Sequence, residues 1–104
     1  LLVVPRRHVE YPTQMSAEER RELLDTVLQY QDKILKCVSN GCDIRQHCRP
    51  FLPEGRTKVN HVHFHLIPRT FKDELYARSQ VCEEGIFKQL PEAERDTFCE
   101  IYSR

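Results

Sequence analysis

The chain has 104 residues, of which 39% are hydrophobic and 31% charged, and 16 basic and 16 acidic side chains cancel to a formal net charge of zero. This length suits one small domain with a modest core. A balanced charge argues against a general attraction to nucleic acid or membranes. No apolar run approaches the ~20 residues of a membrane span, and the apolar run 1–4 is too short for a signal peptide.

The cysteines are odd in number and contain no C-x-x-C pair. Reduced thiols in a cytoplasmic protein are the default for such a set, with metal binding by a subset as the alternative. We therefore expect a cytoplasmic location. The five cysteines are Cys37, Cys42, Cys48, Cys82 and Cys99.

Residues 1–4, Leu-Leu-Val-Val, form a continuous apolar run that is typical of a buried strand. The chain starts in the middle of this apparent strand and without methionine, so we expect that an N-terminal segment is missing. Pro5 ends the run and is followed by Arg6, Arg7 and His8. A basic pair with a histidine at a strand end suits a phosphate, which makes His8 a candidate substrate-binding residue. A solvated loop is the alternative.

Residues 17–37 are predicted to form a long amphipathic helix. Ser16 and Glu19 have the spacing of a capping box. Asn40 and Gly41 are predicted to end the helical segment, since glycine suits the left-handed conformation after a helix. We expect this helix to cover a sheet and to carry no chemistry. Its apolar stripe consists of Leu23, Leu24, Val27, Leu28, Ile34, Leu35 and Val38.

Residues 42–52 alternate well enough to predict a second strand, and residues 53–56, Pro-Glu-Gly-Arg, predict a hairpin turn into the next strand. Charged and polar side chains share one face of this predicted strand. Such a face is usually solvated, so we expect His47 to lie at the surface. The face consists of Asp43, Arg45, His47 and Arg49.

Residues 59–69 read V-N-H-V-H-F-H-L-I-P-R and predict a third strand, with Pro68 as its stop. Side chains two apart on a strand share a face. One face therefore carries three imidazoles: His61, His63 and His65. The opposite face is apolar and is expected to join the core: Val62, Phe64 and Leu66.

Three imidazoles on one face leave three interpretations open. In the first, His63 attacks a phosphorus atom while His61 and His65 hydrogen-bond to phosphoryl oxygens or to the leaving group, because neutral imidazole is a competent nucleophile. In the second, all three bind zinc. In the third, they form the solvated side of an edge strand.

The whole motif, His-Val-His-Phe-His-Leu-Ile followed by Pro68 and Arg69, resembles the signature of the histidine-triad (HIT) family. Residues 1–9 are also similar to a strand of that family that ends in proline, basic residues and histidine. Together with the predicted elements, this indicates an α+β fold: an antiparallel sheet with the long helix packed on one face. Residues 1–69 are the expected core, and residues 70–104 a C-terminal helical extension packed on the same domain.

The resemblance implies a nucleotide hydrolase or nucleotidyltransferase that needs no cofactor. His63 would attack the α-phosphorus to form a covalent nucleotidyl-histidine, assisted by His61 and His65. Thr57, which stands where many family members have glutamine, and Lys58 are expected to donate hydrogen bonds to phosphate.

The same resemblance implies a nucleotide or nucleotide conjugate as substrate and a possible homodimer. From the balanced charge we expect no membrane and no specific nucleic acid as partner. The alternative is a non-catalytic nucleotide- or protein-binding module that keeps the fold. The altered region around Thr57 and the missing N-terminal segment would favour this alternative.

Overall fold

The structure, a computed structural model, describes residues 1–56, 58–75, 77–78, 89 and 91–103. The chain divides into two compact units, Leu1–Phe71 and Lys72–Arg104. The first unit holds a three-stranded antiparallel sheet and a long helix, and the second holds helix α3 (Glu92–Tyr102). The predicted α+β class with a C-terminal helix is confirmed. None of the helices in these described ranges is long and apolar enough to cross a membrane. The packing of residues 70–104 on the core stays a prediction.

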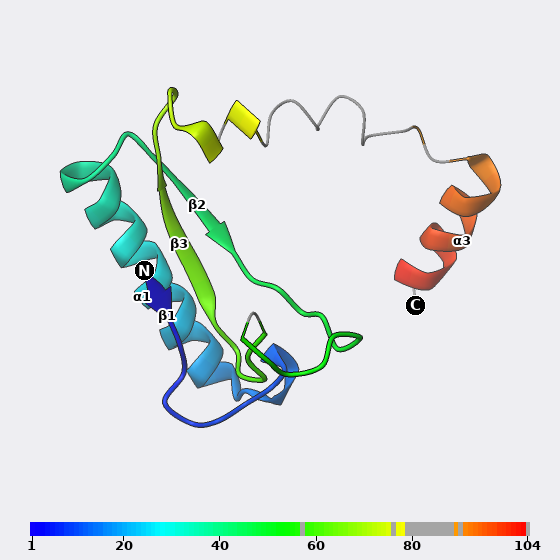
Figure 1. Cartoon of the computed structure of the whole chain (residues 1–104). Helices are drawn as coiled ribbons and strands as arrows, with labels where there is room; N and C mark the ends of the chain where they lie inside the picture. The colour runs from blue at the N-terminus through cyan, green and yellow to red at the C-terminus, as the bar shows by residue number, and fades with distance from the viewer. Residues whose placement is uncertain (57, 76, 79–88, 90, 104) are drawn as a thin grey trace. The chain divides into compact units, whose positions relative to one another are not determined.

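The strand that carries the end of the histidine motif lies in the centre of the sheet (Figure 1). Both of its neighbours run antiparallel to it, and His65 has Leu2 opposite it on one side and Arg45 on the other. This pairing holds the end of the histidine motif between the backbones of the two neighbouring strands. The strand order is β1 (Leu2–Val3), β3 (Phe64–Arg69) and β2 (Gly41–Arg45).

Helix α1 (Ala17–Cys37) covers one face of this sheet and has the predicted bounds (Figure 1). The capping box is confirmed, because the Glu19 amide donates to Ser16 Oγ at 3.1 Å and the Ser16 amide donates to Glu19 Oε2 at 2.8 Å. Arg7 donates to both Glu19 oxygens at 2.8 Å, and these bonds are the main cause that lowers the pKa of Glu19 to about 2. The start of the helix therefore also anchors the segment after β1.

Only part of the predicted helical stripe is buried. Val27 and Ile34 lie in the core and Leu23 packs against it, whereas four members of the stripe remain about half exposed or more. The stripe covers a wider arc of the helix than a sheet of three short strands can cover. The exposed members are Leu24, Leu28, Leu35 and Val38.

Two clusters of buried side chains hold the unit together, and Leu23 and Phe64 pack against both. Val27 and Leu66 are completely buried. The apolar face of the histidine motif enters the core as predicted. The first cluster consists of Val3, Val27, Ile34 and Leu66, and the second of Val9, Met15 and Val62.

The prediction that residues 1–4 form a buried strand is wrong in extent. Only Val3 is buried, while Leu2 and Val4 are 56% and 48% exposed. The reason is geometric: β1 is a two-residue strand at the edge of the sheet, and alternate side chains of such a strand point away from the helix-covered face.

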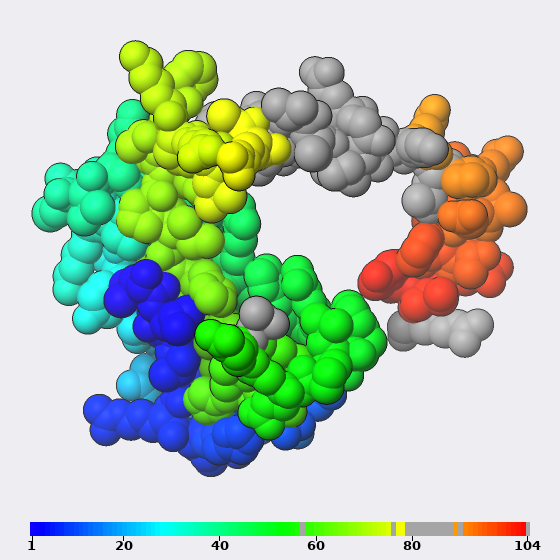
Figure 2. Space-filling view, viewed as in Figure 1, coloured from blue at the N-terminus to red at the C-terminus, as the bar shows by residue number. Residues whose placement is uncertain are grey.

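The second strand is shorter than predicted, because β2 ends at Arg45 and residues 46–52 leave the sheet. The residues before Phe64 bond to the N-terminal segment instead, as the Val62 amide donates to the Val9 carbonyl at 2.7 Å. The predicted turn contains an isolated antiparallel bridge between Gly55 and Lys58. Figure 2 shows the N-terminal segment in blue beside the green segment that contains these residues.

Pro68 does not stop the strand, contrary to the prediction, but lies within β3 opposite Cys42. Leu66 exchanges backbone hydrogen bonds with Leu1 at 2.9 and 3.1 Å, so its amide faces the β1 side of the strand. Backbone groups alternate sides along a strand, so the nitrogen of Pro68 also faces that side and not β2. The ladder to β2 therefore needs no donor from Pro68.

Gly41 does not adopt the predicted left-handed conformation. None of the glycines in the described part of the chain has a positive φ, and Gly41 begins β2. The helix is capped at Val38, whose amide donates to the Ile34 carbonyl at 2.9 Å. Glycine is needed at position 41 for space, because a Cβ there would lie 3.0 Å from the Arg69 carbonyl oxygen and 3.2 Å from Arg69 Cβ.

A Gly41→Ala substitution is therefore expected to lower the free energy of unfolding by about 1–2 kcal/mol, as overpacking against a fixed backbone does. Urea denaturation of both proteins would measure this. Gly55→Ala is the matched control, since a Cβ at Gly55 meets nothing within 4 Å. Equal stability of the two alanine variants would contradict the close approach of β2 and β3.

Candidate functional site

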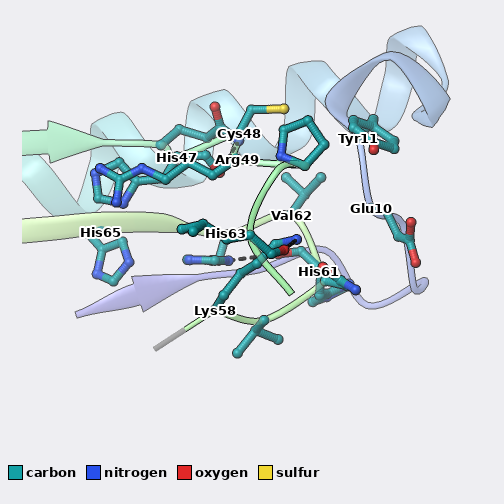
Figure 3. A pocket seen from close by; sticks show the side chains of 15 residues that line it. Glu10, Tyr11, His47, Cys48, Arg49, Lys58, His61, Val62, His63 and His65 are labelled. Atoms are coloured by element: carbon teal, nitrogen blue, oxygen red, sulfur yellow. Dashed lines mark hydrogen bonds between the residues drawn. The ribbon is translucent and has the colours of Figure 1, made fainter. Parts of the chain in front are cut away.

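A cavity of about 100 Å³ lies where the chain enters β3 (Figure 3). All three histidines of the motif line it. His61 and His63 precede the strand, which begins at Phe64, so only His65 lies on β3 as predicted. The loop after β2 and residues 10–11 contribute further walls.

Both ring nitrogens of His61 are engaged by the backbone of the segment after β1. The Val9 amide donates to His61 Nδ1 at 3.3 Å, so Nδ1 is an acceptor. His61 Nε2 lies 3.0 Å from the Pro5 carbonyl oxygen, which can only accept, so Nε2 carries the hydrogen. His61 is therefore a neutral imidazole that ties residues 5–9 to the motif.

His63 has the opposite tautomer. Its Nδ1 lies 2.7 Å from the backbone carbonyl oxygen of His61. A carbonyl oxygen accepts and does not donate, so Nδ1 carries a hydrogen, and in the neutral ring the lone pair is therefore on Nε2. Since the ring lines the cavity, this arrangement presents a nucleophilic nitrogen to a bound molecule.

His65 stands beside His63 with its ring edge-on, at 5.0 Å between ring centroids and an angle of 73°. Its other neighbour is His47, at 5.9 Å and 38°. Burial lowers the pKa of His65, and repulsion from the nearby imidazoles of His63 and His47 in their protonated forms lowers it further. The His65 ring is therefore neutral at physiological pH, with one donor and one acceptor nitrogen.

The predicted substrate-binding residue His8 stacks on His61, with ring centroids 5.1 Å apart and planes 9° from parallel. Its side chain is exposed, and the cavity is lined by other residues of the described ranges. The structure thus brings His8 to a triad histidine and not to the cavity wall.

Lys58 lines the cavity, and its ammonium group donates to the Leu52 carbonyl, which holds the side chain over the loop (Figure 3). Thr57, the other predicted phosphate donor, lies outside the described residues.

His47 and Arg49 also line the cavity, whereas the sequence predicts only a solvated face for them. His47 is exposed as predicted, but it faces His65 and not open solvent alone. The signal that would have found both residues is the pair Pro50 and Pro53. Prolines argue against a strand that continues to residue 52, and a loop is free to fold back over the motif.

No group of three or more histidine, cysteine, aspartate or glutamate side chains in the described ranges is arranged to hold a metal ion. Zinc binding by all three motif histidines would require His61 to give up at least one of its two backbone partners. The geometry therefore favours the interpretation in which His63 is a nucleophile.

Comparison with known proteins gives one match. A family model described as the HIT domain matches residues 1–72, which is more than half of the chain. No curated protein and no solved structure matches the chain.

Proposed function

Because the chain belongs to the HIT family, we propose that it is a nucleotide hydrolase or nucleotidyltransferase that acts at an α-phosphate through a covalent nucleotidyl-histidine on His63. The observation that carries this proposal is the tautomer of His63. Its Nδ1 hydrogen is held by the His61 carbonyl at 2.7 Å, which leaves the Nε2 lone pair at the cavity.

In the first step, His63 Nε2 forms a bond to the α-phosphorus and the bond from phosphorus to the leaving group breaks. The leaving group takes the electron pair of that bond. The imidazole becomes cationic, and the His61 carbonyl that accepts from Nδ1 stabilises this charge. In the second step, water or another acceptor attacks the phosphorus and gives up its proton to solvent. The N–P bond breaks, its electron pair returns to Nε2, and neutral His63 is regenerated. Two displacements replace one difficult one.

The other two motif histidines have different roles in this proposal. His61 positions His63 through its backbone carbonyl, while its own ring is held by Pro5 and Val9. His65 is neutral and lies against His63, so its donor nitrogen can bond to a phosphoryl oxygen or to the leaving group.

The phosphate donors remain part of the proposal. Lys58 lines the cavity and brings a cationic donor close to His63. The hydroxyl group of Thr57 is proposed as a second donor. His8 is proposed to support the site through its stack on His61. Donors aimed at developing negative charge are what such a transfer requires.

The cavity volume of about 100 Å³ is small beside the roughly 300–1,000 Å³ of pockets that hold drug-sized ligands. This space suits the reacting phosphoryl group. We propose that the base and sugar are bound by residues other than those that line the cavity.

The proposal is tested by mixing the protein with adenosine phosphoramidate or with a dinucleoside polyphosphate and following AMP release. Release from either substrate supports it. Nucleotide binding without any release would overturn it and support the alternative, a non-catalytic nucleotide-binding module.

We also propose that the chain forms a homodimer through the exposed stripe of helix α1. Leu24, Leu28, Leu35 and Val38 recur at the spacing of helix-to-helix contacts. Analytical ultracentrifugation is expected to show dimers that Leu28→Glu converts to monomers, since the change places a charge in the contact. Gln29→Glu adds the same charge beside the stripe and is expected to leave the dimer intact. A monomeric wild-type protein would contradict this.

We propose a cytoplasmic location because the described cysteines have free thiols. The four described cysteines, Cys37, Cys42, Cys48 and Cys99, are all free, and three of them are exposed. Exposed free thiols are typical of proteins kept in a reducing compartment.

A further inference from the structure

We propose that His47, together with Arg49, binds the leaving group and selects substrates whose leaving group carries phosphate. This inference rests on the proposed function, because it assigns a subsite next to the nucleophile His63. Both residues come from the loop after β2, outside the histidine motif, and both line the cavity.

Three imidazoles form a continuous row that starts at the nucleophile. His65 lies 5.0 Å from His63, and His47 lies 5.9 Å from His65, measured between ring centroids. His61 is not part of this row, because its ring stacks on His8 and bonds to the backbone of Pro5 and Val9. The row therefore leads from His63 toward the loop that carries His47 (Figure 3).

One end of the cavity is basic because the Arg49 cation lies toward it, and the other end is acidic because it carries the Glu10 carboxylate (Figure 3). In the close-up view, His65 and His47 lie at one end with Arg49 next to His47, and Glu10 and Tyr11 lie at the other end, beyond His61 (Figure 3). An anion is attracted to the basic end and repelled by the carboxylate of the other. An extended substrate is therefore oriented by its own charge distribution.

The difference in charge between the two ends of the cavity distinguishes the two groups that are bonded to an α-phosphorus. In a nucleoside polyphosphate, one side of that atom carries the uncharged nucleoside and the other carries the further phosphates that leave. The phosphates match the end with His47 and Arg49, and the nucleoside leaves the cavity past the opposite end, beyond Tyr11. When His63 Nε2 bonds to the phosphorus and the P–O bond breaks, the electron pair stays on the leaving phosphate oxygen. A charge-assisted hydrogen bond from Arg49 and a hydrogen bond from the His47 ring then stabilise it.

When the substrate is a phosphoramidate, the leaving group is ammonia. Ammonia carries no phosphate, so this subsite has nothing to bind. The two substrates thus separate the leaving-group role from a general structural role. We expect His47→Gln and Arg49→Gln each to lower kcat/KM for a dinucleoside polyphosphate about 10- to 100-fold, the size of a lost hydrogen bond to a charged group. For adenosine phosphoramidate we expect a change of less than about threefold. Arg21→Gln makes the same charge change on the exposed surface of α1 and should alter neither value.

Equal losses on both substrates, or no loss on either, would overturn the inference. A second measurement is independent of turnover: calorimetric titration of His63→Ala protein with inorganic triphosphate. Adding His47→Gln is expected to weaken binding about tenfold, and adding Arg21→Gln is expected to leave it unchanged. A wild-type protein that releases no AMP refutes the proposed function. Triphosphate binding that does not depend on His47 refutes the subsite.

Discussion

Replacement of His63 by alanine is expected to lower kcat for AMP release by at least about a thousandfold, because it removes the atom that forms the bond to phosphorus. The fold should be unaffected, since the His63 ring is only partly buried and, within the described part of the chain, its ring hydrogen bond goes to the neighbouring His61 carbonyl. Steady-state kinetics on both substrates would measure the loss, with thermal unfolding of the same samples as a check on folding.

A chemical rescue sharpens this test. His63→Gly removes the ring and leaves additional space in the cavity, so added imidazole is expected to restore part of the activity as a diffusible nucleophile. Activity that survives in both variants would show that another group attacks the phosphorus. Loss of activity together with a lower unfolding temperature would point to a structural role for His63.

His61→Ala is expected to lower both stability and turnover. It removes the acceptor of the Val9 amide and the donor to the Pro5 carbonyl, and a buried donor left without its partner costs about 1–3 kcal/mol. Because residues 5–9 then no longer fix residue 61, the carbonyl that orients His63 is expected to shift. We expect kcat to fall about 10- to 100-fold, as a small misplacement of a reacting group does.

The control for His61 is a variant that keeps a donor and an acceptor. His61→Gln is expected to recover part of the stability and turnover lost in His61→Ala. The pH dependence of kcat separates the two possible roles. A positioning residue leaves the shape of the profile unchanged in the variant, whereas loss of one limb of the profile would identify His61 as an acid or base.

Local signals in the sequence were sufficient for the main elements of the fold. Ser16 and Glu19 fix the start of α1, because their capping box depends only on residues three apart. The two-residue alternation of the histidine motif likewise separates its imidazoles from its apolar side chains. Val62 and Leu66 are buried, as the pattern predicts.

The remaining features depend on contacts between residues far apart in the chain. The tautomer of His61 follows from its bonds to Val9 and Pro5, which lie more than 50 positions away in the chain. The need for glycine at position 41 comes from Arg69 on the neighbouring strand. No local pattern contains these partners. For the loop that brings His47 to the cavity the sequence predicts a strand, since its residues alternate as strand residues do.

The central claim is that a nucleotide becomes attached to His63 during the reaction. Its most direct test is to quench a reaction with a dinucleoside polyphosphate within a single turnover and to map the modified peptide by mass spectrometry. We expect an AMP adduct on the peptide that contains His63, and its N–P bond should be labile in acid. An adduct on a different residue, or full turnover without any adduct, would contradict the account.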